Sequence, residues 1–466
     1  MAMGKKKRKR QQSMWVLASE LPASPGHPFY SRLNAILEGE LFDEYVESRC
    51  RRFYADGVGR PGLAPGRYFR LLLLGYFEGL DSERGIAWRV ADSLGVRGFL
   101  GLDVSERGPD HSTISRTRRL IDVETHREVF TWVLERLAKS GLLSGKTLSV
   151  DGTTLEANAA MRSIVRRDSG ETYPEYLTGL AQASGVRTPS RAALARLDRR
   201  RKKKGSNDEW MSPADPDAKI TKMKDGRTHL AHKAEHAVDL KTGAVVAVTI
   251  QDADAGDTST IKETLSEAQA RLDQVMRKPE LCGAVSDVQE MVADRGYHST
   301  AVLLDLEEAG IRPYISEPDR GRRRWKDDIN AQMATYENRR RIRGARGKRL
   351  HRRRAELCER SFAHAYETGA MRRTHLRGHP NILKRLLIHL GAFNLGLLLR
   401  HRFGSGTPRG LQGRPGRFLT MLLQLYRSWR PILVRHTRSI HALTPLCRYR
   451  HPILRGTRPY PSATGC

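Results

Sequence analysis

In the first third of the chain, apolar residues recur at the spacing of amphipathic helices. The stretch YFRLLLLGYFEGL, residues 68–80, is one example. Successive patterns of this kind predict an all-α domain over residues 26–130. One of its helices lies in PDHSTISRTRRL, residues 109–120, where a proline and cap-type residues precede a run rich in serine, threonine and arginine.

That short helix has the composition of a DNA-reading helix. Its polar side chains are able to reach bases or phosphates, as those of the recognition helix in a helix-turn-helix unit do. The residues in question are Ser112, Thr113, Ser115 and Arg116. A capped surface helix would have the same composition, so these residues alone leave DNA contact open.

Residues 140–400 mix strand patterns with helix patterns. The run LSVDGTTLEANA alternates like a strand around Asp151-Gly152, a dipeptide that also favours a hairpin turn because both residues tolerate positive φ. Next, LAHKAEHAVDL and AVVAVTIQ, joined across KTG, predict a β-hairpin. The later predicted elements are a helix at 258–276, a strand at 290–297, a helix between Ser299 and Gly310, a strand at 312–316 and a helix near 352–366.

Three segments lack this periodicity. Residues 160–230 are polar and basic and predict an insertion or long loop within the second domain. Residues 1–25 predict a disordered basic arm, in which KKKRKR is expected to touch the DNA backbone. Residues 401–466 predict a basic C-terminal tail.

Charge is the strongest compositional signal. Lysine and arginine number 82 against 52 aspartates and glutamates, a formal net charge of +30 in 466 residues. The excess recurs in separate runs, among them RRRKKK at 199–204 and the stretch from Arg339 to Arg354. One such run is often solvated surface, but several in one chain indicate a polyanionic partner, and nucleic acid is the natural one.

The sequence predicts a cytoplasmic protein without a membrane partner. The apolar run at 381–400 contains Lys384, Arg385 and His389, which would be costly at the centre of a bilayer, so it predicts a packed helix. The cysteines show no CxxC spacing, which argues against a zinc site or a disulfide framework. They are Cys50, Cys282, Cys358, Cys447 and Cys466.

The order of predicted elements in the second domain is that of ribonuclease H-like folds. We therefore expect an α/β chain: a mixed sheet flanked by helices, preceded by an all-α N-terminal DNA-binding domain with a helix-turn-helix-like segment. In such folds acidic residues converge from the ends of central strands and from a late helix. Here Asp151 is expected to end the first strand and Asp294 the fourth.

A third acid, Glu359, lies on the predicted last helix. It shares an apolar stripe with Ala355, Phe362 and Tyr366 at helical spacing. An ionised glutamate on a core-facing stripe is expensive unless something positive pairs with it. Each acid alone has an ordinary structural explanation, but three acids at these three positions indicate a catalytic set.

Motifs around these acids resemble those of a known family. VDGTTLEANA, VADRGYHS and ERSFAHAYETGAMRRTHLRG resemble the three acidic motifs of DDE transposases from bacterial insertion sequences, and GPDHSTISRTRR resembles the N-terminal region of those enzymes. The resemblance runs from about residue 30 to about residue 410. It implies that Asp151, Asp294 and Glu359 form a catalytic, metal-binding triad.

The resemblance also implies basic residues that hold DNA phosphates near the triad. The family's third motif has an arginine upstream of the glutamate, which Arg354 can supply, and a basic residue downstream, for which Arg372 or Arg373 stand nearest. Arg295 and Arg360 follow two of the acids directly and are further candidates for DNA contact.

Phosphodiester chemistry suits three carboxylates. Two hard cations about 3.5–4 Å apart activate the attacking oxygen and support the leaving one. Magnesium prefers oxygen ligands and manganese can substitute for it, so Asp151 would bridge two ions, Asp294 would bind one and Glu359 the other. Gly152 would let the DNA backbone approach. The expected partners are the element's terminal inverted repeats and target DNA, bound by a homodimer that assembles on DNA.

Two other functions fit the same residues. A nuclease or resolvase of this fold would stop at hydrolysis, and a catalytically inactive DNA-binding protein would account for the charge but not for Glu359 on an apolar stripe. Other acids near the predicted elements could also replace a member of the triad. These are Glu156, Asp252, Asp254, Asp257 and Glu356.

Overall fold

The computed structural model describes residues 26–55, 62–201, 205–223, 225–319 and 328–411, together with residues 321, 323 and 325. The predicted basic arm at 1–25 therefore lies outside the described residues, as does the predicted tail from residue 412 onward.

Seven helices make up the described part of the N-terminal region, as its periodicity predicts. They are α1 (Pro28–Gly39), α2 (Phe42–Cys50), α3 (Pro65–Glu78), α4 (Glu83–Asp92), α5 (Leu94–Phe99), α6 (His111–Leu120) and α7 (Val123–Lys139). The helix predicted to read DNA is α6, and the Asp110 carboxylate caps it by accepting a hydrogen bond from the backbone N–H of Ser112. Between α5 and α6 the chain passes through residues 100–110, which is longer than the tight turn of a helix-turn-helix unit. The helix-turn-helix-like segment is thus two helices joined by a loop.

The sheet has the mixed topology that the sequence predicts. Its strands are β1 (Thr147–Glu156), β4 (Lys219–Lys222), β5 (Thr228–Asp239), β6 (Val245–Asp252), β7 (Glu290–Ala293) and β8 (Arg312–Ile315). They run in the order β4-β5-β1-β7-β8, with β6 also paired to β5. β5 is antiparallel to β1, whereas β7 lies parallel to β1 and β8 parallel to β7.

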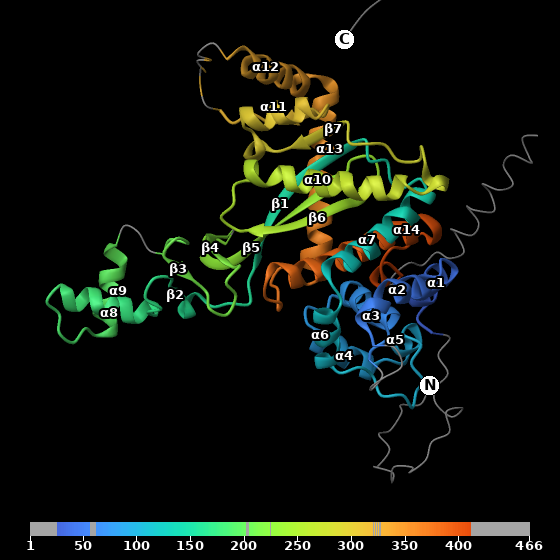
Figure 1. The fold of residues 1–466 in the computed structure, drawn as a ribbon, viewed down its shortest axis with the longest axis horizontal. Helices are drawn as coiled ribbons and strands as arrows, with labels where there is room; N and C mark the ends of the chain where they lie inside the picture. The colour runs from blue at the N-terminus through green and yellow to red at the C-terminus, as the bar shows by residue number, and fades with distance from the viewer. Residues whose placement is uncertain are drawn as a thin grey trace, which may run out of the picture. The chain divides into compact units, whose positions relative to one another are not determined.

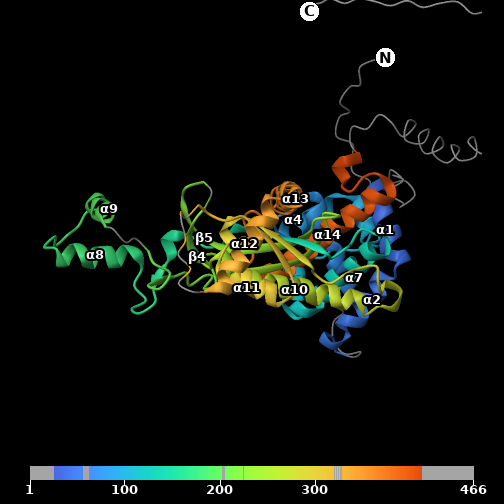
Figure 2. The same cartoon turned by 90° about the horizontal axis from the view of Figure 1, so that it is seen from above.

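Helices cover both faces of this sheet. The remaining long helices are α10 (Asp257–Met276), α11 (Thr300–Glu308), α12 (Ile329–Arg343), α13 (Ala345–Phe362) and α14 (His379–Phe403). Figures 1 and 2 show α10 against one face of the sheet and α13 against the other. A π-helical turn over Ala363–Thr368 follows α13. The fold is therefore the predicted ribonuclease H-like arrangement with an N-terminal helical region.

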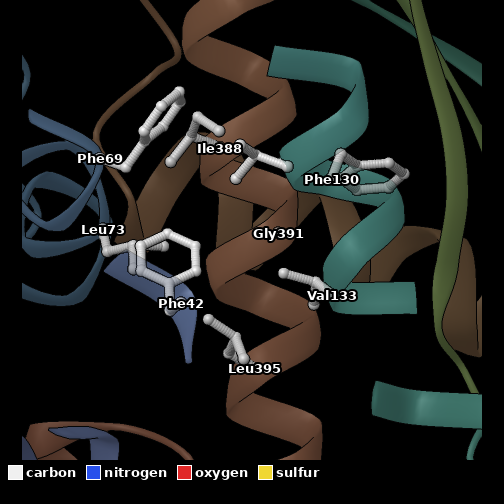
Figure 3. A pocket seen from close by; sticks show the side chains of 9 residues that line it. Phe42, Phe69, Leu73, Phe130, Val133, Ile388, Gly391 and Leu395 are labelled. Carbon is white, nitrogen blue, oxygen red and sulfur yellow. The ribbon is translucent and has the colours of Figure 1, made fainter. Parts of the chain in front are cut away.

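The helical region and the sheet share one hydrophobic core, which extends along the chain from Phe29 to Leu399. Figure 3 shows the small apolar pocket where four helices meet. It is lined by Phe42 of α2, Phe69 and Leu73 of α3, Phe130 and Val133 of α7, and Ile388, Gly391 and Leu395 of α14. The boundary predicted near residue 130 therefore marks a change in the sequence pattern. It does not divide two separate hydrophobic cores.

The helix α14 is the packed helix predicted from the apolar run. It is long and apolar enough to cross a membrane by length and composition, but most of it is buried inside the protein. Its Lys384 donates a hydrogen bond to the carbonyl of Arg118, and its Arg385 donates one to the carbonyl of Leu80. These contacts explain how two cations are accommodated in an apolar helix.

The insertion has more structure than the predicted loop. It contains β2 (Val165–Arg166), α8 (Tyr173–Ala183), α9 (Arg191–Arg200) and β3 (Trp210–Met211), and a small second core forms around Trp210. No residue of α9 is buried. The loop interpretation is therefore wrong at α9, which is an amphipathic helix whose residues all stay at least partly exposed.

Candidate active site

Asp151 lies inside β1 and not at a turn. The strand continues from Thr147 through Glu156, and Asp151 pairs with His236 of β5. Both the hairpin interpretation and the expectation that Asp151 ends the strand are therefore wrong. On its other edge β1 pairs with β7 only as far as Ser149, which leaves the backbone at Asp151 unpaired on that side.

Asp294 follows β7 directly, as predicted. Its carboxylate caps the short helix Arg295–Tyr297 and accepts a hydrogen bond from the Gly296 N–H at 2.9 Å. Since β1 and β7 are parallel neighbours, their ends bring Asp294 close to Asp151. Burial raises the pKa of Asp151 to about 6; the Asp294 carboxylate also raises it, whereas Arg354 lowers it. The fold thus brings two of the three predicted acids together.

Arg354, on α13, contacts Asp151. Its Nη1 lies 2.7 Å from Oδ2 of Asp151, and both side chains are largely buried, at 18% and 19% exposure. In this structure Arg354, which was expected to bind a DNA phosphate, forms an ion pair with Asp151. The guanidinium is therefore within reach of a phosphate that approaches Asp151.

Glu359 lies on the solvent-facing side of α13, so the predicted apolar stripe is wrong. The residues that α13 buries are Gly347, Leu350, Leu357, Cys358 and Ser361. Within the described residues, no hydrogen bond or ion pair joins Glu359 to Asp151 or Asp294. However, the thiol of Cys358 lies 3.2 Å from the Ser149 hydroxyl. Burial raises its pKa to about 12, and the charges of Asp151 and Glu359 add to that rise. Cys358 is therefore close to both carboxylates.

The space beside the Cα of Gly152 is occupied by side chains of the protein itself. A Cβ at this position would lie 3.2 Å from Cε of Lys233 and 3.2 Å from the hydroxyl of Tyr297. The prediction that this glycine admits the DNA backbone is therefore wrong, because the space in front of its Cα is already filled.

The candidate site contains ligand atoms of the type that a hard divalent cation prefers, but it contains fewer carboxylates than the three predicted. Asp151 and Asp294 offer carboxylate oxygens, and their mutual repulsion is what a bound cation would relieve. Among the described residues, no three histidine, cysteine, aspartate or glutamate side chains converge as a metal cluster. A two-aspartate pair is therefore present, and Glu359 would have to join it.

The residues predicted to touch DNA differ in exposure. On α6, Ser112 and Arg116 are exposed, whereas Thr113 and Ser115 are partly buried. Arg295 is exposed beside Asp294, and Arg360 pairs with Glu356 at 2.6 Å.

Downstream of the triad, two arginines reach the end of β1. Arg372 donates a hydrogen bond to the hydroxyl of Thr153 at 3.2 Å. Arg373 lies 3.7 Å from Glu156. Both of the basic residues considered for the third motif are thus close to the strand that carries Asp151.

The sequence did not single out a buried lysine beside the two aspartates. Lys233 of β5 pairs with Glu235 at 2.9 Å and with Asp257 at 2.6 Å. Asp257 also adds to the rise in the pKa of Asp151. The signal was present in HLAHKAEH, where two opposite charges lie on one face of an otherwise apolar strand.

Known families match most of the chain. Residues 19–120 match a transposase domain (DUF772), and residues 173–395 match a transposase DDE domain. The second match contains Asp294, Arg354 and Glu359, whereas Asp151 precedes it. No curated protein matches the chain. With the ribonuclease H-like fold and the paired aspartates, these matches show that the chain belongs to the DDE transposases of insertion sequences.

Proposed function

We propose that this transposase binds the ends of its insertion sequence, cleaves phosphodiester bonds there and joins the 3′ ends to target DNA by in-line transesterification. The observation that carries the proposal is the pair Asp151 and Asp294. Asp151 lies in β1, Asp294 directly follows the parallel neighbour β7, and burial together with the charge of Asp294 raises the pKa of Asp151.

The acids are proposed to hold two magnesium ions, for which manganese can substitute. Asp151 would bridge both ions, Asp294 would bind one and Glu359 the other. Bound there, the ions would supply stabilisation of charge on the phosphate oxygens and activation of the attacking hydroxyl. Asp151 lies in the sheet and Asp294 directly follows it, whereas Glu359 is exposed on α13 and would have to reach the two aspartates.

Basic residues are proposed to orient the DNA. Arg354, beside Asp151, is placed to hold a non-bridging phosphate oxygen, and exposed Arg295 and partly exposed Arg360 extend the positive surface on either side. Ser112 and Arg116, on the exposed face of α6, would read the element's terminal repeats, with Thr113 and Ser115 supporting them.

Transposition needs two element ends to be joined together, so we propose that the protein acts as a homodimer assembled on DNA. Its place of action would be the nucleoid of a bacterial cytoplasm. A protein with a formal net charge of +30 is suited to that polyanionic setting.

The test is a cleavage and joining assay on a labelled DNA fragment that carries the element's own end, with magnesium and a supercoiled target. The parent protein should nick the 3′ end and join it to the target. Asp151→Asn, Asp294→Asn and Glu359→Gln should each abolish cleavage and leave DNA binding intact. Asp254→Asn is the matched control, because Asp254 bonds only to Asn207 of the insertion among the described residues.

Each possible result distinguishes the proposed transposase activity from the two alternative functions. Nicking without joining would identify a nuclease, and binding without nicking would identify a DNA-binding protein. If one of the three variants cleaves at the parent's rate, that residue is not part of the catalytic triad.

A further inference from the structure

A buried ammonium group lies beside the two aspartates. Nζ of Lys233 lies 2.6 Å from Oδ1 of Asp257 and 2.9 Å from Oε1 of Glu235, and it donates a hydrogen bond to the Thr260 hydroxyl at 2.9 Å. The side chain of Lys233 is 7% exposed and that of Glu235 is fully buried. A charge buried this deeply is costly unless its partners surround it, so these contacts hold Lys233 in one position.

The same contacts extend to two further hydroxyl groups. Glu235 accepts hydrogen bonds from Thr264 at 2.7 Å and from Tyr297 at 3.0 Å. We call the set the Lys233 cluster; it consists of Lys233, Glu235, Asp257, Thr260, Thr264 and Tyr297. It joins β5, the first turns of α10 and the short helix after β7.

The Lys233 cluster holds the turn that carries Asp294. The far end of the turn is fixed by the hydrogen bond from Tyr297 to Glu235. In its middle, a Cβ at Gly296 would lie 2.3 Å from Oδ2 of Asp257 and 3.2 Å from Oδ1 of Asp294. The two carboxylates therefore face the same point, and Asp257 packs directly against the backbone that positions Asp294.

The Lys233 cluster also touches the strand that carries Asp151. Gly152 follows Asp151, and a Cβ there would lie 3.2 Å from both Cε of Lys233 and the Tyr297 hydroxyl. One rigid group of side chains thus contacts the immediate neighbour of Asp151 and the turn of Asp294.

We propose that Lys233 and Asp257 are positioning residues that set the separation of the Asp151 and Asp294 carboxylates before a divalent cation binds. Lys233 offsets the negative charge that Asp257 adds beside the two aspartates, and it holds Asp257 against Gly296. The proposal rests on the proposed function, because it assigns Asp151 and Asp294 to cation binding.

The test measures Mn²⁺ binding by the full-length protein without DNA, from the electron paramagnetic resonance signal of free Mn²⁺. Asp257→Asn and Lys233→Met should each weaken Mn²⁺ binding by about 10–100-fold, as loss of a residue that orients metal ligands does. Cleavage at saturating DNA should slow, and KM for DNA should stay unchanged. The double variant should bind no more weakly than the weaker single variant, because both changes disrupt one contact.

Two control variants separate positioning from general stability. Asp252→Asn removes a carboxylate that pairs with Lys219 at 3.3 Å, away from the Lys233 cluster, and should leave Mn²⁺ binding unchanged. Val275→Ala opens space under the buried end of α10 and should lower Tm without weakening Mn²⁺ binding. If Lys233→Met does not fold, Asp257→Asn carries the test, since it leaves Lys233 paired with Glu235.

The possible results test the positioning role of Lys233 and Asp257 separately from the proposed function on which it rests. It is overturned if Asp257→Asn binds Mn²⁺ and cleaves DNA like the parent while Asp151→Asn loses both; the proposed function then stands. It is also overturned if Val275→Ala weakens Mn²⁺ binding as much as Asp257→Asn does. If Asp151→Asn itself keeps Mn²⁺ binding and cleavage, the proposed function fails and this inference fails with it.

Discussion

The guanidinium of Arg354 and the carboxylate of Asp151 form an ion pair at 2.7 Å between α13 and β1. Because both side chains are largely buried, loss of either partner would leave an unpaired charge inside the protein, so the pair ties α13 to the sheet. It also neutralises one acid of the site. A cation that binds Asp151 must therefore compete with Arg354 or share the carboxylate with it.

The first prediction concerns this arginine. Arg354→Lys should slow strand joining by roughly tenfold or more and change DNA affinity little, since a lysine ammonium cannot hold Asp151 and a phosphate in the planar, bidentate manner of a guanidinium. Overall affinity is spread over many other cations. The measurement compares joining rates at a salt concentration where both proteins are fully bound. Equal joining rates there would mean that Arg354 is only a structural partner of Asp151.

The second prediction concerns pH and the metal-free protein. Folding raises the pKa of Asp151 from 3.8 to about 6, mainly by burial. The folded state then holds this proton more tightly than the unfolded state, so Asp151 reduces stability as pH rises from about 4 to about 6 and above. Asp151→Asn should therefore remove this pH-dependent loss of stability, which amounts to about 1–3 kcal/mol at pH 7, while at every pH it leaves the buried guanidinium of Arg354 without its carboxylate partner.

Denaturant unfolding of both proteins across pH 4–8 checks this prediction. The free energy of unfolding of the variant relative to that of the parent should rise between about pH 4 and pH 6 and stay constant above that range. A gap that does not change with pH would show that Asp151 does not titrate in this range.

Strands β5, β6, β7 and β8 and the helix α10 could be predicted from the sequence because each is periodic or continuously apolar and is bounded by turn residues. The hairpin of β5 and β6 is an example: KTG supplies Gly243, which adopts a positive φ of 81° in the turn. The insertion helices were not predicted, because the segment is polar and basic as a whole and α9, although amphipathic, buries none of its residues.

The face that α13 buries could not be predicted from its apolar residues alone. The predicted stripe passes through Ala355, Glu359 and Phe362, which all lie within α13, whereas the helix buries the face that includes Leu350 and Leu357. Apolar residues at helical spacing thus occur on two faces of this helix, and the sequence does not say which of them meets the core. The Lys233 cluster was missed because a strand with alternating charges is typical of a solvated face, and the sequence does not say that α10 covers it.

The third prediction tests Glu359 against its neighbour on α13. Glu359→Gln should abolish cleavage, whereas Glu356→Gln should leave it unchanged. Glu356 is 60% exposed, and among the described residues it pairs with Arg360 one turn away, an interaction worth about 0.3–0.5 kcal/mol. Both variants are measured in the cleavage assay, with DNA binding as the control for folding. The opposite result would move the third acid of the triad to Glu356.

The fourth prediction concerns specificity at α6. Arg116→Ala should reduce discrimination between the element's end and random DNA by about 1–3 kcal/mol if the exposed guanidinium makes a bidentate base contact. Arg118→Ala is the matched control: its side chain is buried and pairs with Glu83 at 3.0 Å, so it should lower Tm and leave discrimination intact. Equal losses of Arg116→Ala on both DNAs would make Arg116 a phosphate contact.

The last prediction separates two roles for Gly152. In Gly152→Ala the new Cβ would press on Lys233, Tyr297 and Glu235, at 3.2–3.4 Å, inside a packed region. Overpacking of this kind costs about 1–3 kcal/mol, so the variant should lose stability and cleave slowly while it binds DNA like the parent. Gly98→Ala, where no atom lies within 4 Å of the new Cβ, should keep all three properties. If Gly152→Ala instead keeps its stability and loses DNA affinity, the glycine serves the approach of DNA after all.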